Sequence, residues 1–107
     1  MILVLHNSRF LTDSLAGTLP DPACCLPVAA VLTDRLDSAF RLTQNLERPW
    51  TGHPAVQVLP AARDGARSTS AGDVLIDAAG AAWVASDRGF LPLPPRGHPD
   101  DASRAGQ

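Results

Sequence analysis

Prolines divide this chain into short segments, and this limits what it can fold into. Ten of the 107 residues are proline, and they recur from Pro20 to Pro99. A proline removes a backbone N–H donor and fixes φ, so it interrupts helices and is confined to the ends or edges of strands. We therefore expect short elements. A chain of this length is expected to form one domain with one modest hydrophobic core.

Short apolar runs between the prolines are typical of strands. They are residues 1–5, 28–32, 74–76, 81–85 and 89–91, and residues 55–59 form a further expected strand with an alternating pattern. Residues 74–85 are expected to form a hairpin near the centre of the sheet, because Gly80 in the connecting turn can take a positive φ. Residues 24–27 are expected to form a loop or an edge, since Pro27 interrupts regular pairing.

One segment has the periodicity of a helix. Its apolar face consists of Leu32, Leu36, Phe40, Thr43 and Leu46. The pattern predicts a helix over residues 34–47, capped by Thr33 or Asp34. Burial of its large apolar side chains is expected to contribute about 1.5–3 kcal/mol each. A shorter helix is expected after Phe10 and should end at Gly17.

These elements together predict an α+β domain. We expect a small, mostly antiparallel sheet of four or five strands, with the helix over residues 34–47 packed on one face. The domain is expected to cover residues 1–93. Residues 94–107 are polar, contain Gly, Pro, Asp and Ser without periodicity, and are expected to form a flexible C-terminal tail.

The charge pattern argues against nucleic acid and membranes as partners. The net charge is −2, and the basic residues are nine arginines spread along the chain, so no basic field would attract a polyanion. The apolar run at residues 1–5 is too short for a signal-peptide core or a membrane span. A cytoplasmic protein is expected. Cys24 and Cys25 are expected to be thiols that pack as small hydrophobic residues, since neighbouring cysteines rarely bond to each other.

Patterns of catalytic or metal-binding residues are absent from the sequence. His6, His53 and His98 are dispersed, and with the adjacent cysteines they lack the spacing of a zinc site. The chain has no Gly-x-Ser-x-Gly elbow and no phosphate-binding loop with its lysine. We therefore expect no catalytic residue, no metal and no cofactor.

The densest group of polar side chains is the segment from Arg67 to Asp73. In one interpretation the segment is structural: hydroxyl groups cap backbone amides, Asp73 accepts turn amides, and Arg67 pairs with Asp73 or Asp87. In the other it is a recognition surface, on which Arg67 donates to an anionic or carbonyl group of a partner. The structural interpretation is favoured, because a polar loop before a strand needs no ligand.

Trp50 is unusual in the polar connector over residues 47–54. It either plugs the edge of the core or forms an exposed contact, and the plug is favoured because large aromatic side chains rarely stay exposed. If the chain has a partner-binding site, the expected residues are, in order, Arg67, Trp50, Ser68, Ser70 and Asp73. Gly72 and Gly89 are expected to be structural.

A longer pattern runs through residues 36–91. The chain reads Arg-Ser-x-Ser-x-Gly-Asp-Val from Arg67 to Val74, and this is followed by a hairpin with an aromatic residue and by Gly89-Phe90. Further matches are Thr43, Asn45, Trp50, Thr69 and Gly80. The pattern resembles small accessory proteins of phages and plasmids, including the YodL-like domains of plasmid proteins. Trp83 departs from it, since Tyr is usual at that position, as do Ala71, where Val is common, and Arg88.

The resemblance implies an accessory protein of a mobile genetic element. Such proteins often act by stoichiometric binding to a host protein or defence complex, so we expect a non-catalytic inhibitor of the anti-CRISPR or anti-restriction type. The alternative is a small-ligand or nucleotide-sensing module that uses the loop from Arg67 to Asp73. A minor enzyme is the third possibility, and the missing catalytic patterns weigh against it.

Overall fold

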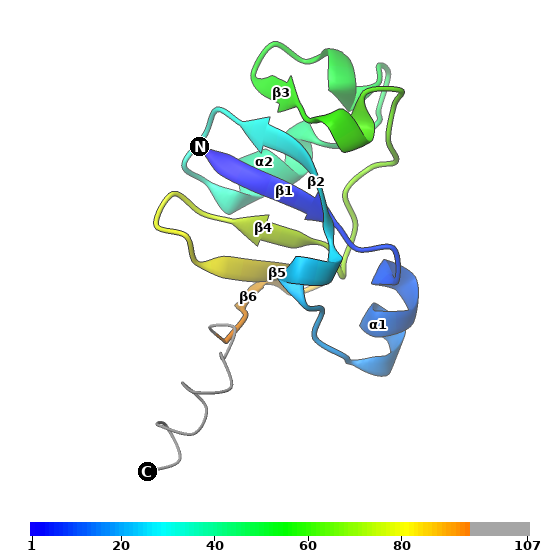
Figure 1. Ribbon diagram of the computed structural model, residues 1–107, viewed down its shortest axis with the longest axis vertical. Coiled ribbons are helices and arrows are strands. Elements are labelled where there is room, and N and C mark those ends of the chain that lie inside the picture. Colours follow the sequence, from blue (N-terminus) through cyan, green and yellow to red (C-terminus); the bar gives the residue numbers. More distant parts are fainter. Residues whose placement is uncertain (95–107) are drawn as a thin grey trace.

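A computed structural model describes residues 1–94, which form one antiparallel sheet with two helices (Figure 1). The strands are β1 (Ile2–His6), β2 (Leu26–Val31), β3 (Val56–Val58), β4 (Val74–Ile76), β5 (Ala82–Ser86) and β6 (Gly89–Pro92). The helices are α1 (Phe10–Ala16) and α2 (Leu36–Leu42), and the single-turn helices are η1 (Pro22–Cys24), η2 (Trp50–Gly52) and η3 (Pro60–Ala62). The predicted α+β class is confirmed.

The sheet has six strands in the order β3-β2-β1-β4-β5-β6, more than the four or five predicted. All six coincide with strand-like segments of the sequence, and the edge strands are short: β3 ends two residues before Pro60 and β6 ends at Pro92. The apolar strand β1 lies in the middle and pairs with β2 and β4, so Val4 faces both Ala29 and Leu75. The β4–β5 hairpin lies beside β1, close to the predicted place.

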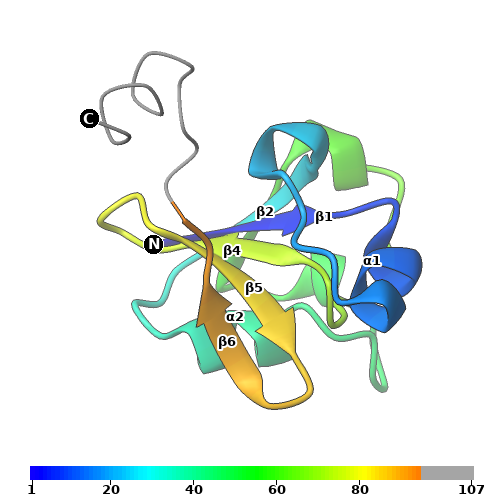
Figure 2. The ribbon, with the colours of Figure 1, turned by 90° about the horizontal axis from the view of Figure 1, so that it is seen from below.

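Helix α2 covers one face of the sheet, as predicted (Figure 2). Beneath it lies the main hydrophobic cluster, which includes Ile2, Val4, Ala29, Val31, Leu75 and Ala85. Phe40 of α2 packs edge-on against Phe90 of β6, with ring centroids 6.1 Å apart. This contact holds the helix against the far edge of the sheet.

The helix is shorter than the predicted span of residues 34–47. It begins after Arg35 without a side-chain cap, so the expected capping by Thr33 or Asp34 is wrong. It ends at Thr43, whose hydroxyl donates to the carbonyls of Ala39 (2.9 Å) and Phe40 (3.1 Å). These bonds satisfy the last carbonyls and close the helix early.

Two residues of the predicted apolar face of this helix are therefore outside the core. Leu46 is 80% exposed and Leu32 is 65% exposed, because both lie beyond the ends of α2. The shorter helix α1, by contrast, ends as predicted at Gly17, which takes a left-handed conformation with φ 67°.

Of the residues 24–27 expected to form a loop or an edge, Cys24 and Cys25 lie outside the sheet, but β2 already begins at Leu26, before its proline. Pro27 lies opposite Leu5, where the β1–β2 register shifts by a bulge between Val4 and Leu5. A bulge leaves part of the ladder unpaired, and a strand can accommodate a proline there.

No helix in residues 1–94 is long and apolar enough to cross a membrane. The predicted tail over residues 94–107 lies outside the described part of the chain, except for Pro94.

Candidate functional site

A buried ion pair is the centre of the predicted polar loop. The guanidinium of Arg67 donates to both carboxylate oxygens of Asp73, from Nη1 to Oδ2 and from Nη2 to Oδ1, each at 2.7 Å. Asp73 is completely buried, and the side chain of Arg67 is 33% exposed. Two parallel charge-assisted hydrogen bonds form the strongest common geometry between these groups.

Asp73 also accepts backbone hydrogen bonds from the distant loop after β1 and from its own loop. The N–H of Asn7, after β1, donates to Oδ1 at 2.8 Å, and the N–H of Ser70 donates to Oδ2 at 2.7 Å. Gly72 allows this arrangement, because its φ is 93° and an added Cβ would lie 2.5 Å from the carbonyl oxygen of Phe10. The expectation that Gly72 is structural fits this close approach.

Each terminal nitrogen of Arg67 makes a second hydrogen bond within the chain. Nη1 donates to the carbonyl of Ser68 at 2.9 Å, and Nη2 donates to the carbonyl of Asn7 at 3.1 Å. The guanidinium lies over the ring of Phe10, 3.9 Å from its centroid, which is a cation–π contact. Arg67 thus joins the loop after β1, helix α1 and the loop before β4.

His6 lies beside this ion pair and is held neutral by its surroundings. Its Nε2 atom is 2.9 Å from the hydroxyl of Thr69 and 4.0 Å from Asp73 Oδ2, and its ring packs edge-on against Trp50. Burial lowers the pKa of His6 to about 4; the charge on Asp73 opposes this shift and the charge on Arg67 adds to it.

Thr69, His6 and Asp73 together have the composition of a nucleophilic triad, but their geometry differs from one. In a triad the acid binds the ring nitrogen opposite the nucleophile, whereas here Thr69 and Asp73 both approach Nε2. Thr69 is also only 2% exposed, which leaves a substrate no access to its hydroxyl. These three residues form a packed polar cluster.

The other half of the loop fixes the chain that follows α2. Ser68 Oγ accepts from the N–H of Asn45 at 2.7 Å, and Asn45 Oδ1 accepts from the N–H of Trp50 at 3.0 Å. Trp50 Nε1 in turn donates to the carbonyl of Arg67 at 2.9 Å. Trp50 is 2% exposed, so it plugs the core as favoured above.

The structure brings all five predicted site residues into one network. Asp73 and Trp50 are buried within it, while Arg67, Ser68 and Ser70 are partly exposed at its surface. The structural interpretation of the loop, with Arg67 paired to Asp73, is confirmed. Contact of the five residues with a partner stays a prediction.

Sequence reasoning missed His6, Asn7 and Phe10 as members of this network, and it named Asn45 only as part of the family resemblance. Asn7 binds the carboxylate of Asp13 and the carbonyl of Gly72 through its side-chain amide. The available signal was positional: His6 and Asn7 are polar residues directly at the end of a buried apolar strand, where an unpaired polar group would be costly.

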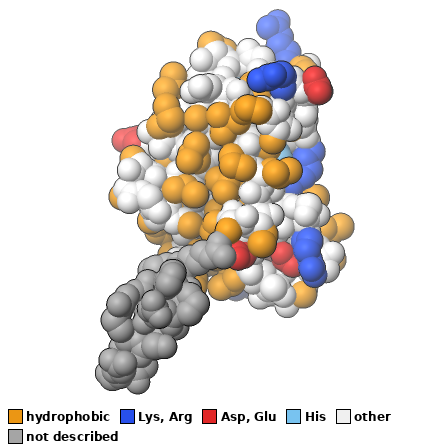
Figure 3. Space-filling view, viewed as in Figure 1, with side chains coloured by type: hydrophobic (Ala, Val, Ile, Leu, Met, Phe, Trp, Pro, Cys, Tyr) orange, Lys and Arg blue, Asp and Glu red, His pale blue; other side chains and the backbone are white. Residues whose placement is uncertain are grey.

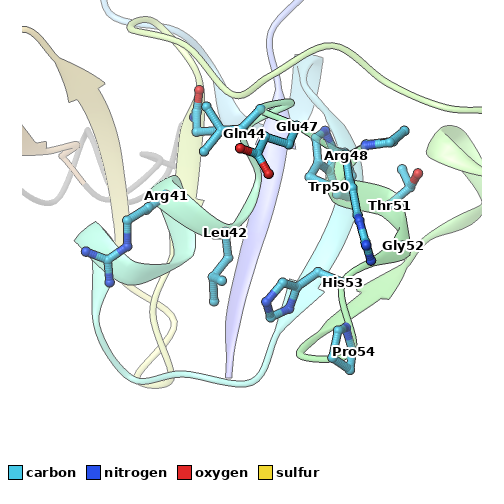
Figure 4. Close-up of a pocket in the computed structure, with 12 residues that line it drawn as sticks. Arg41, Leu42, Gln44, Glu47, Arg48, Trp50, Thr51, Gly52, His53 and Pro54 are labelled. Atoms are coloured by element: carbon cyan, nitrogen blue, oxygen red, sulfur yellow. The ribbon is translucent and has the colours of Figure 1, made fainter.

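A groove lies next to this network, on the side of the sheet that carries α2 (Figure 4). Its volume is about 980 Å³, and it is lined by the end of α2, by Gln44 and by residues 46–54. Trp50 is part of its wall. The Asn45 and Trp50 bonds described above therefore also fix the shape of this groove.

The opposite face of the sheet is apolar and only partly covered. Two rows of directly paired residues cross it: Ala30, Leu3, Ile76 and Ala82 in one, and Leu5, Val74, Val84 and Leu91 in the other. Cys25 and Leu93 pack over part of the second row. We call the less covered part the open face and define it as the exposed Leu3 and Leu91 with the half-buried Ile76 and Ala82.

Figure 3 shows this side of the molecule, where hydrophobic side chains gather over the sheet and charged side chains lie mostly around the margin. Leu3 is 36% exposed although its strand is paired on both sides, and Leu91 is 49% exposed. Among residues 1–94, His, Cys, Asp and Glu side chains form no cluster of three that could hold a metal ion.

Comparisons of the chain with protein-family models, with curated proteins and with solved structures each give no match.

Proposed function

We propose that the chain is a non-catalytic binding protein of a phage or another mobile genetic element, which inhibits a host defence complex of the CRISPR or restriction type by stoichiometric protein binding. The mobile-element origin rests on the resemblance of residues 36–91 to accessory proteins of phages and plasmids. The binding role rests on the surface of the domain.

The observation that carries the binding role is the open face. An antiparallel sheet that has one face in water normally alternates apolar and polar residues along its strands. Strands β1 and β4 instead carry apolar residues on both faces; Leu3 and Leu91 are exposed, and Ile76 is only half-buried. Exposed apolar patches of this kind mark protein–protein contacts.

The network around Asp73 supports this role indirectly, because it makes the domain rigid. Arg67 ties the loop after β1 to the loop before β4, and strands β1 and β4 carry Leu3 and Ile76. A surface that is already ordered loses less conformational entropy on binding.

Affinity capture tests the proposal. The tagged chain would be incubated with a lysate of bacteria that contain CRISPR and restriction systems, with and without nuclease, and bound proteins identified by mass spectrometry. We expect one stoichiometric protein complex that resists nuclease and is lost with Leu91→Glu, which adds a charge to the open face. Leu91 lies on an edge strand and is 49% exposed, so this variant should fold.

The matched control is Leu15→Glu. Leu15 is 81% exposed on α1, and its substitution makes the same chemical change away from the open face. Equal loss of capture in both variants would contradict a role for the open face. Capture that disappears with nuclease would identify nucleic acid as the partner, and the absence of any partner protein would refute the proposal.

The groove favours a second candidate, a small-ligand or nucleotide-sensing module. Its volume of about 980 Å³ is at the upper end of the range for small-molecule sites. The loop from Arg67 to Asp73 is less suited to this role, since the guanidinium is already paired. A thermal-shift screen against nucleotides tests this candidate, and the stabilisation should grow with ligand concentration.

A further inference from the structure

The groove beside α2 differs in chemistry from the open face. Its wall contains apolar side chains from Leu42, Leu46, Pro49, Trp50 and Pro54. Leu46 is 80% exposed, so its side chain is available to a bound group. The groove can therefore accept an apolar side chain of a partner.

The charges along the groove are unbalanced. Arg41 and Arg48 line it together with a single acid, Glu47, although the chain as a whole has a net charge of −2. Ion pairs engage Arg9, Arg35 and Arg67, but within residues 1–94 none involves Arg41 or Arg48. Figure 4 shows Arg41 at one end of the groove and Arg48 at the other.

The walls of the groove are fixed before anything binds. Trp50 is held through its backbone N–H by Asn45 and through its indole by the carbonyl of Arg67. Pro49 and Pro54 restrict the backbone on either side of η2. A preformed cavity with a few placed charges is typical of recognition sites.

We propose that this groove binds an acidic, extended segment of a partner protein, anchored by an apolar side chain between Arg41 and Arg48. The apolar wall accepts the anchor, and the two guanidinium groups pair with carboxylates on either side of it. Nucleic acid is disfavoured as the occupant, because two arginines offset by one glutamate would neutralise few phosphates. This inference goes beyond the proposed function, since α2 and the open face lie on opposite sides of the sheet.

Selection from a random peptide library displayed on phage tests the inference, because it does not require the partner to be identified first. The folded wild-type chain and the double variant Arg41→Glu/Arg48→Glu would be immobilised in parallel. We expect the wild type to enrich peptides that combine several acids with a large apolar residue. A selected peptide, labelled with fluorescein, should bind the double variant at least roughly tenfold more weakly and lose affinity with added salt.

The matched control is Arg63→Glu/Arg88→Glu, which makes the same change of charge at exposed positions outside the groove. It should bind the peptide as the wild type does. The proposal is overturned by no enrichment, by enrichment of neutral or basic peptides, or by equal binding to the groove variant. If a selected peptide binds both the wild type and Leu91→Glu while capture from lysate fails, the proposed function is wrong and this inference stands.

Discussion

At the scale of single residues, the stability of the domain depends on how Asp73 is neutralised. A fully buried carboxylate that loses its cationic partner keeps the cost of desolvation, and breaking such a pair typically destabilises a protein by about 3–5 kcal/mol. Since Arg67 is partly exposed, we expect Arg67→Ala to cost about 3 kcal/mol in urea unfolding, the lower end of that range. Arg67→Lys, which keeps the charge but loses the paired geometry, should lie between the wild type and Arg67→Ala.

The double variant Arg67→Ala/Asp73→Ala completes a thermodynamic cycle for this pair. The two single substitutions are expected to be strongly non-additive, because each removes the same pair of hydrogen bonds. Additive losses of free energy would show that the pair contributes little and would contradict its central role in the fold.

His6 makes the stability dependent on pH. Its pKa is lowered from 6.5 to about 4 in the folded chain, so the unfolded chain binds a proton at a higher pH than the folded chain does. The free energy of unfolding should therefore fall as the pH decreases from 6.5 to 4, by up to about 3 kcal/mol from this residue. Urea unfolding across this range measures the effect.

One variant isolates the contribution of His6. His6→Gln should flatten the pH dependence between 6.5 and 4. If the wild type and His6→Gln lose stability in parallel, the buried histidine is not the cause.

At the scale of elements, the length of α2 decides which apolar residues matter. Phe40 packs against Phe90 and the main cluster, so we expect Phe40→Ala to cost about 3 kcal/mol, the lower end for buried aromatic residues. Leu46→Ala is the matched control, since an exposed residue should change stability by no more than about 0.5 kcal/mol. Comparable losses in thermal unfolding would instead support a helix that extends through residue 47.

The sequence predicted the strands because most are continuous apolar runs and β3 alternates around Gln57. It predicted the covering helix because Leu36 and Phe40 recur at helical spacing. It misplaced the helix end because the Thr43 hydroxyl bonds to Ala39 and Phe40 and the Thr43 carbonyl accepts from the N–H of Thr69. That last contact joins segments distant in the chain, and local periodicity carries no information about it.

The candidate site was likewise predicted only where its contacts are local in the sequence. The pairing of Arg67 with Asp73 was accessible, since both lie in one short loop. The contacts of this pair with Asn7 and Phe10 were not, because about sixty residues separate them. The groove and the open face depend on where α2 packs, so the sequence could indicate neither of them.

At the scale of the whole molecule, loops that would ordinarily be mobile are tied into one cooperative unit. The N–H of Asn7 and the N–H of Ser70 both donate to the buried carboxylate of Asp73. Backbone amides in loops usually exchange through small local openings, but opening either loop here would leave Asp73 partly unpaired in the interior. We therefore expect both amides to exchange only by global unfolding in native-state hydrogen exchange followed by NMR. The amide of Ala79, which is exposed in the β4–β5 turn and binds the half-buried Asp77, should exchange much faster. Equal exchange of all three amides would mean that the network around Asp73 opens locally and does not unite the fold.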